Sequence, residues 1–220
     1  MSIKGMQVKD PGSAITHFIG SVGAALAATP LLVKANHSAA SEMLSLSIFI
    51  FSMFLLYTAS TLYHTFNISD KVNKALKKFD HMSIYLLIAG TYTPICVLVL
   101  DNSIGYLMLG IIWTMAALGI CFTAFWVTCP KWLSAAIYII MGWTCVMAFG
   151  PLLDSLSPAA FGWLLTGGII YTIGGVIYAL KLPIFNNKHK NFGSHEIFHL
   201  FCLGGSLCHF ILIYVYIAGV

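Results

Sequence analysis

Residues 195–217 read HEIFHLFCLGGSLCHFILIYVYI, a mostly apolar run that opens with the pattern H-E-x-x-H. A helix that crosses the roughly 30 Å hydrocarbon core of a bilayer needs about 20 such residues. His195 and His199 are four positions apart, so both imidazoles lie on one helical face and can bind one divalent ion. Ionisable side chains are costly in a membrane helix. This stretch therefore predicts a transmembrane fold and a functional site together.

The composition of the whole chain agrees with a membrane protein. Of its 220 residues, 59% are hydrophobic and 8% are charged, and the mean hydropathy is +0.90. A soluble globule of this size needs more polar surface. We expect an all-α integral membrane protein of the plasma membrane, a single domain over residues 1–220, with seven transmembrane helices. The expected helices are 13–33, 44–66, 80–100, 104–126, 132–150, 160–180 and 195–217.

The lysines predict the orientation of the bundle. The chain has no arginine, and ten of its eleven lysines fall on one side of the predicted helices, with only Lys34 on the other. The positive-inside bias then predicts a cytoplasmic N-terminus and a C-terminus outside. Lys4, Lys9 and Ala25-Leu26-Ala27 also resemble a signal peptide, but the apolar run continues to Val33, so we expect an uncleaved first helix. The ten lysines are Lys4, Lys9, Lys71, Lys74, Lys77, Lys78, Lys131, Lys181, Lys188 and Lys190.

The net charge of +4 consequently indicates contacts with anionic headgroups and no nucleic-acid partner. Between the second and third helices, residues 67–79 place apolar side chains at helical spacing among four lysines. This pattern favours a short helix on the cytoplasmic surface, with a solvated loop as the alternative.

Several ionisable residues share one predicted depth. His64 ends the second helix, Asp80 opens the third, and His195 and His199 open the seventh, all from the same side. Ser60 lies one turn above His64 on the same helical face. The predicted order and direction of the helices therefore place these candidate ligands in the same leaflet of the membrane.

The best-known reading of H-E-x-x-H is a zinc protease, with Glu196 as general base and a third ligand downstream. Residues 200–220 contain no Asp or Glu. His209 would lie roughly 15 Å deeper than His199, too far to share its ion. The third ligand should therefore come from upstream, where the depth of His64 fits best. Glu196 is turned about 100° from His195 and is free to face a neighbouring helix or the interface.

Separated motifs along the chain carry a family resemblance. They are Thr16-His17-Phe18-Ile19-Gly20, Ser60-x-x-x-His64, Asp80, Gly90-Thr91-Tyr92-Thr93-Pro94 and His195-Glu196-Ile197-Phe198-His199. In this order they resemble the hemolysin III family, the bacterial branch of the progestin and adipoQ receptor family, which includes the adiponectin receptors. The resemblance implies a zinc ion (Zn²⁺) near the cytoplasmic leaflet, held by His64, His195 and His199, with Asp80 contacting it through water.

The sequence departs from the family before the first helix, where an acidic residue and an Asn often precede Thr16-His17. Asp10 and Ser13 are the nearest substitutes. Other roles also have alternatives: Asp80 could cap the third helix, and Ser60 could bond the carbonyl four residues before it. His17 could support a ligand or join two helices, and His209 is expected to make a buried polar contact.

Three functions are compatible with these residues. The first is a zinc-dependent hydrolase of a lipid amide or ester, with Asp80 as general base and Ser60 orienting water or the oxyanion. The wider superfamily includes alkaline ceramidases, which favours this hypothesis and a membrane lipid as substrate. The second is a non-enzymatic membrane-homeostasis or receptor-like protein in which zinc clamps the second and seventh helices. The third is the pore-forming haemolysin that the family name implies.

Overall fold

The computed structural model describes residues 8–35, 39–180 and 193–219. In these ranges seven helical segments are long and apolar enough to cross a membrane, and no strand occurs. The prediction of an all-α protein with seven membrane helices is therefore confirmed. The elements are α1 (Pro11–Lys34), α2 (Ala40–Thr65), α3 (Asp70–Leu98), α4 (Asn102–Phe125), α5 (Lys131–Gly142), η1 (Trp143–Ala148), α6 (Phe149–Ser155), α7 (Pro158–Leu180), α9 (Ser194–Ile211) and η2 (Leu212–Ile217).

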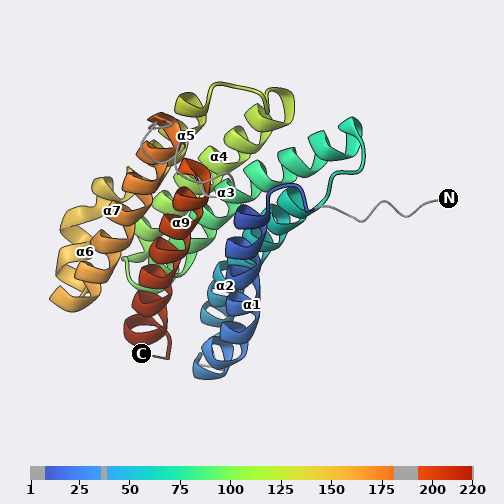
Figure 1. Cartoon of the computed structure of the whole chain (residues 1–220). Helices are drawn as coiled ribbons and strands as arrows, with labels where there is room; N and C mark the ends of the chain where they lie inside the picture. Colours follow the sequence, from blue (N-terminus) through green and yellow to red (C-terminus); the bar gives the residue numbers. More distant parts are fainter. Residues whose placement is uncertain (1–7, 36–38, 181–192, 220) are drawn as a thin grey trace.

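The helices pack in a closed ring. In order, the ring runs α1, α2, α3, α5, α7, α9 and back to α1, while α4 packs mainly against α3. Figure 1 shows α9 between α7 and α1, with α2 beside α1. This arrangement brings the first and last membrane helices together and encloses the interior in which the candidate site lies.

The third helix begins ten residues earlier than predicted. Ser69 caps it by accepting a hydrogen bond from the Val72 amide at 3.4 Å, and the carboxylate of Asp70 in the first turn favours the helix N-terminus. Residues 70–79 are helical as expected, but they continue directly into the membrane span. The prediction of a separate surface helix is therefore wrong, and so is the start of the predicted helix at residue 80.

The fifth span is interrupted near its middle. The expected helix 132–150 divides into α5, the 3₁₀ segment η1 and α6, which extends to Ser155. Pro151 has no amide hydrogen and its ring crowds the carbonyl four residues earlier, which disfavours a continuous α-helix there. The Tyr92 hydroxyl fills the gap: it donates to the Gly142 carbonyl at 2.6 Å and accepts from the Cys145 amide at 2.7 Å. A side chain of α3 thus stabilises the break in α5.

The seventh span changes from α-helix to π-helix near its C-terminal end. α9 ends at Ile211 and is followed by the π-helical segment η2. The other predicted boundaries, for α1, α2, α4 and α7, lie within four residues of the observed ones. The ends that carry His64, His195 and His199 are therefore well placed by the sequence, whereas the helix end predicted at Asp80 is not.

Candidate metal centre

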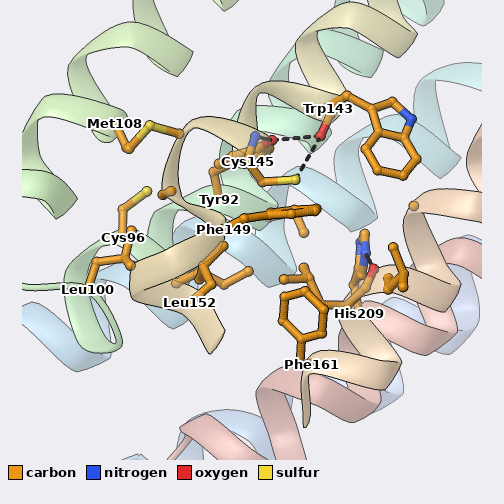
Figure 2. A pocket seen from close by; sticks show the side chains of 17 residues that line it. Tyr92, Cys96, Leu100, Met108, Trp143, Cys145, Phe149, Leu152, Phe161 and His209 are labelled. Atoms are coloured by element: carbon orange, nitrogen blue, oxygen red, sulfur yellow. Dashed lines mark hydrogen bonds between the residues drawn. The ribbon is translucent and has the colours of Figure 1, made fainter. Parts of the chain in front are cut away.

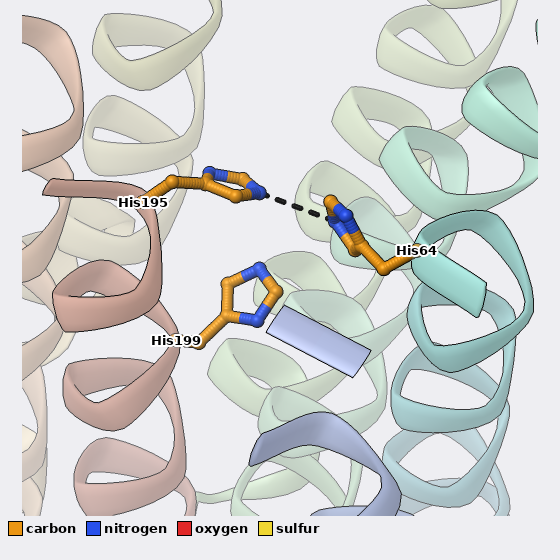
Figure 3. A group of neighbouring side chains, drawn as sticks. All are labelled: His64, His195 and His199. Atoms are coloured by element: carbon orange, nitrogen blue, oxygen red, sulfur yellow. Dashed lines mark hydrogen bonds between the residues drawn. The ribbon is translucent and has the colours of Figure 1, made fainter. Parts of the chain in front are cut away.

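Three histidines from two helices converge inside the ring. His64 comes from the last turn of α2, and His195 and His199 come from the first turns of α9 (Figure 3). One ring nitrogen of each lies within 4.8 Å of the others. His64 and His199 are each only 2% exposed. The structure brings together the three residues that the sequence singled out by depth.

Hydrogen bonds select the nitrogens that face the centre of the cluster. Nδ1 of His64 lies 2.9 Å from the Asp10 carboxylate. Nδ1 of His199 lies 3.3 Å from the Ser13 carbonyl and 3.2 Å from the Thr16 hydroxyl. A carbonyl or carboxylate oxygen can only accept a hydrogen bond, so both Nδ1 atoms are assigned as N–H donors. The lone pair of each Nε2 is then free for a metal, and each ring is held by the partner on its other nitrogen.

One spacing in the cluster, between His64 and His195, matches tetrahedral metal coordination, and the three candidate ligand atoms lie within 4.8 Å of one another. Nε2 of His64 and Nε2 of His195 are 3.2 Å apart, and Figure 3 draws this contact. Two nitrogens bound tetrahedrally to zinc at about 2.0–2.1 Å are about 3.3 Å apart. Among the described residues no carboxylate or thiol joins the three histidines as a fourth ligand. Three protein ligands with one open position are typical of catalytic rather than structural zinc.

Asp80 and Ser60 lie beside the cluster in the same cavity. Asp80 is 7% exposed and Ser60 is 1% exposed, and both line the cavity together with His195 and His199. The Ser60 side chain lies within interacting range of the Asp80 carboxylate, although its Oγ has no hydrogen-bond partner among the described residues. Two alternative readings are thereby wrong: Asp80 lies inside α3 rather than at its cap, and Ser60 does not bond its own helix.

The cavity has a volume of about 140 Å³ and a mostly apolar lining drawn from the ring helices. It reaches from the histidine cluster to His209, roughly 15 Å further along α9. A second cavity of about 60 Å³ adjoins it (Figure 2). The two cavities share Thr91, Tyr92, Gly142, Trp143, Gly168 and His209.

The first turns of α1 support the cluster. The His17 ring stacks on the His199 ring with a centroid distance of 3.6 Å and an interplanar angle of 6°. Neither nitrogen of His17 has a hydrogen-bond partner among the described residues, so its packing against a candidate ligand explains its position better than a hydrogen bond between helices. Asp10 and Ser13, named only as substitutes in a divergent family element, contact His64 and His199 directly.

The Glu196 carboxylate is hydrogen-bonded to groups outside the histidine cluster. Its Oε1 accepts a hydrogen bond from the Ser13 hydroxyl at 2.6 Å, and its Oε2 accepts one from the Gly193 amide at 2.7 Å. Both carboxylate oxygens are therefore engaged in joining α1 to the start of α9. The structure agrees with the expectation that Glu196 faces a neighbouring helix.

His209 makes the buried polar contact that was expected. Its Nε2 lies 3.2 Å from the Leu164 carbonyl of α7, and the residue is 9% exposed. A Cβ atom added at Gly167 would come within 2.5 Å of this nitrogen. The glycine therefore allows the imidazole to approach the backbone of α7, which is a structural role.

Comparison with known proteins agrees with the motifs. The family model described as "Haemolysin-III related" matches residues 6–210. The chain is 40% identical to Hemolysin-3 of Bacillus cereus over 93% of its own length and 90% of that protein. It is also 40% identical to the Hemolysin-3 homolog of Bacillus subtilis, over 93% of its length and 92% of that protein. A shorter match, 35% identical over 26% of the chain and 14% of the other protein, is to the adiponectin receptor protein of Drosophila melanogaster.

These matches and the seven membrane-length helices of the described residues identify a multi-pass membrane protein. The chain belongs to the haemolysin-III related family.

Proposed function

We propose that this protein is a zinc-dependent hydrolase that cleaves an ester or amide bond of a membrane lipid. The observation that carries the proposal is the placement of three convergent histidines and a buried carboxylate in one cavity inside a membrane bundle. The metal would be held by His64, His195 and His199, whose nitrogen donors suit zinc. Zinc bound in this way would lower the pKa of water in its open position to about 7 and polarise a carbonyl group.

Asp80 supplies the base in this proposal. Its carboxylate accepts a proton from water as the water oxygen forms a bond to the carbonyl carbon of the lipid. The bond from that carbon to the ester oxygen or amide nitrogen then breaks, and the proton passes to the departing oxygen or nitrogen. The products are a carboxylic acid and an alcohol or amine, so the reaction consumes one water and no other reagent.

Ser60 is proposed to position the reacting groups. Its hydroxyl is buried, lacks a described hydrogen-bond partner and lines the cavity beside Asp80. A hydroxyl in this situation can donate a hydrogen bond to water or to the negative charge that develops on the carbonyl oxygen. The unsatisfied donor would then be paired during the reaction, which avoids the cost of leaving it unpaired.

The lipid substrate class is supported by where the cavity lies. The lining between the histidines and His209 is mostly apolar and is enclosed by membrane helices, so it suits an acyl chain better than a polar substrate. The resemblance to a superfamily with alkaline ceramidases favours the same class. The excess of lysines at the histidine end of the bundle supports placing the site in the cytoplasmic leaflet.

The proposal is tested by fatty-acid release from vesicles. Purified protein is reconstituted with a mixed lipid extract, and free fatty acid is measured with added zinc, after chelation, and after zinc is restored. We expect release that is lost on chelation and recovered with zinc. Release that is the same in all three conditions would show that a metal-dependent hydrolase is not responsible.

A second candidate function is supported by the packing of the ring. α9 packs most closely against α7 and α1, and α2 packs most closely against α1 and α3. The described contacts between α2 and α9 include the Tyr57 hydroxyl, which lies 2.5 Å from the Ser206 hydroxyl and 3.3 Å from the Cys202 carbonyl. The histidine cluster brings a second set of side chains from the same two helices together. A zinc ion there would clamp the two helices across the interior without any turnover, as expected for a membrane-homeostasis or receptor-like protein.

A further inference from the structure

Three lysines from three elements surround the histidine end of the cavity. Lys9 precedes α1, Lys77 lies in the part of α3 that precedes Asp80, and Lys131 is the first residue of α5. We refer to these three residues as the lysine rim. Each is half-buried, whereas Lys71 and Lys74 on the first turns of α3 are exposed. Lys78 is not included in the rim, because its Nζ donates a hydrogen bond to the Ala124 carbonyl near the end of α4.

Two of the rim lysines lie over tyrosine rings that border the histidines. Nζ of Lys9 is 3.6 Å from the centre of the Tyr63 ring, and that ring is 4.7 Å from the His64 ring. Nζ of Lys131 is 4.5 Å from the centre of the Tyr178 ring, and that ring is 5.6 Å from the His195 ring. Cation–π contacts restrict a flexible lysine to a small region. One ammonium is thus placed near His64 and the other near His195.

The charges of the rim act on the inside of the cavity. Lys9 and Lys77 both interact electrostatically with Asp80. Lys77 and Lys131 both interact with His81, which also lines the cavity, and Lys131 interacts with His195. The three lysines therefore place positive charge near the end of the cavity where the proposed reaction takes place.

Asp10 and Asp80 attract the Lys9 ammonium without forming an ion pair with it among the described residues. Among the described residues Asp10 is paired with His64, and no ion pair to Lys9 or Lys77 occurs there. Burial lowers the pKa of the Lys9 ammonium below its ordinary value. A partly desolvated ammonium gains stability when an anion comes to it, because the anion replaces the lost hydration.

Exposed tryptophans place the rim at the level of lipid headgroups. Trp126 is 47% exposed and Trp132 is 62% exposed, and they lie on either side of the start of α5, where Lys131 is found. Tryptophan is enriched at the boundary between hydrocarbon and headgroups. The rim is therefore positioned to meet the charged part of a lipid, while the apolar cavity is positioned to meet an acyl chain.

We propose that Lys9, Lys77 and Lys131 bind the phosphate of an anionic membrane phospholipid. The identification of this lipid as the substrate rests on the hydrolase function proposed above. An ammonium group is a compact donor well suited to phosphate oxygens. The ester carbonyls of such a lipid are only a few bonds from its phosphate, so binding at the rim directs a carbonyl toward the histidines and Asp80.

Binding is tested with lipids that cannot be hydrolysed. Zinc-loaded protein is titrated with dialkyl ether phosphatidylglycerol, with dialkyl ether phosphatidylcholine of the same chain length, and with soluble glycerol 1-phosphate, and bound ligand is measured by native mass spectrometry. We expect phosphatidylglycerol to bind at least about tenfold more tightly than phosphatidylcholine, since the lysines attract the net negative charge of the phosphatidylglycerol headgroup and phosphatidylcholine carries no net charge.

Matched variants test the role of the rim. Lys77→Gln/Lys131→Gln should lose about tenfold or more of the preference for phosphatidylglycerol, and Lys77→Arg/Lys131→Arg should retain it, because the positive charges are kept. Lys71→Gln/Lys74→Gln removes the same charge from exposed positions and should leave the preference unchanged within about twofold. The arginine variant also shows whether loss of binding reflects loss of charge or loss of folding.

The outcomes separate this proposal from the hydrolase. Equal binding of the two ether lipids, or an undiminished preference in Lys77→Gln/Lys131→Gln, would overturn the rim as a site for an anionic phospholipid. Binding of glycerol 1-phosphate without phosphatidylglycerol would overturn the lipid assignment. Fatty-acid release from diacyl lipids is measured in parallel. If the protein prefers ether phosphatidylglycerol but releases no fatty acid, the result supports the lysine rim and contradicts the hydrolase. If it releases fatty acid but shows no preference between the ether lipids, the result supports the hydrolase and contradicts the rim.

Discussion

The carboxylate of Asp10 lies 2.9 Å from Nδ1 of His64, although 54 residues separate them in the chain. His64 thereby has its proton on Nδ1 and its Nε2 lone pair directed at His195. A carboxylate that bonds the outer nitrogen of a metal-binding histidine fixes the orientation of the ring and raises its basicity. The residue before the first membrane helix thus sets the geometry of a ligand at the end of the second.

Asp10→Asn should weaken zinc binding by about 10- to 100-fold, as is typical when such a partner is lost. The asparagine keeps the size of the side chain but removes its charge, so it supports the imidazole less well as a ligand. Affinity is measured by competition with a chelator of known strength. Asp101→Asn, an exposed change before α4, is the control and should leave the affinity unchanged; equal affinities for both variants would contradict the role of Asp10.

The purified protein should contain about one zinc per chain, because three imidazole nitrogens form a site suited to this ion. His64→Ala/His195→Ala should lose the metal and unfold at a lower temperature, since bound metal contributes directly to the folding free energy. His81→Ala is the matched control, because His81 lines the same cavity outside the cluster. Elemental analysis that finds zinc retained in the double variant would rule out this ligand set.

Glu196→Gln should keep zinc and activity while lowering stability. The side chain accepts hydrogen bonds from Ser13 and Gly193, and glutamine has only one acceptor oxygen and no charge. The loss of one such charged hydrogen bond costs about 1–3 kcal/mol. Thermal unfolding and fatty-acid release are measured together. A full loss of activity with zinc still bound would instead identify Glu196 as the catalytic base.

The cytoplasmic N-terminus is a prediction from the lysine asymmetry, and labelling tests it. In a cysteine-free background, Lys74→Cys should be protected from a membrane-impermeant thiol reagent in intact cells, whereas Asn102→Cys and Ser155→Cys should react. Lys74 lies at the histidine end of the bundle, and Asn102 and Ser155 lie at helix ends on the opposite side. The reverse labelling pattern would place the metal centre in the outer leaflet.

The sequence predicted the parts of the site that depend on depth. His64, His195 and His199 lie at corresponding ends of their helices, and helix length and the lysine pattern are sufficient to find those ends. Asp80 lies at a matching depth although α3 begins ten residues before it. The convergence of the three histidines followed from that depth. Hydrophobic periodicity is a long-range average, so it locates spans well and local interruptions poorly.

The contacts that depend on particular side chains were not predictable in this way. Tyr92 stabilises the break after Gly142 through two hydrogen bonds from another helix, and no local pattern in α5 encodes that partner. Asp10 lies outside the helices, where periodicity carries no information about contacts. The one available signal was its position before Thr16-His17, in the element where the family usually has an acidic residue.

Fatty-acid release by Asp80→Asn at full zinc occupancy tests the central claim most directly. The histidines are unchanged in this variant, so zinc content and thermal stability should stay close to wild type. If Asp80 is the base, release from vesicles should fall by about 10²- to 10⁴-fold, the usual contribution of general-base catalysis. If zinc only clamps α2 to α9, Asp80→Asn with zinc bound should match the wild-type protein in every assay, and that result would contradict the hydrolase.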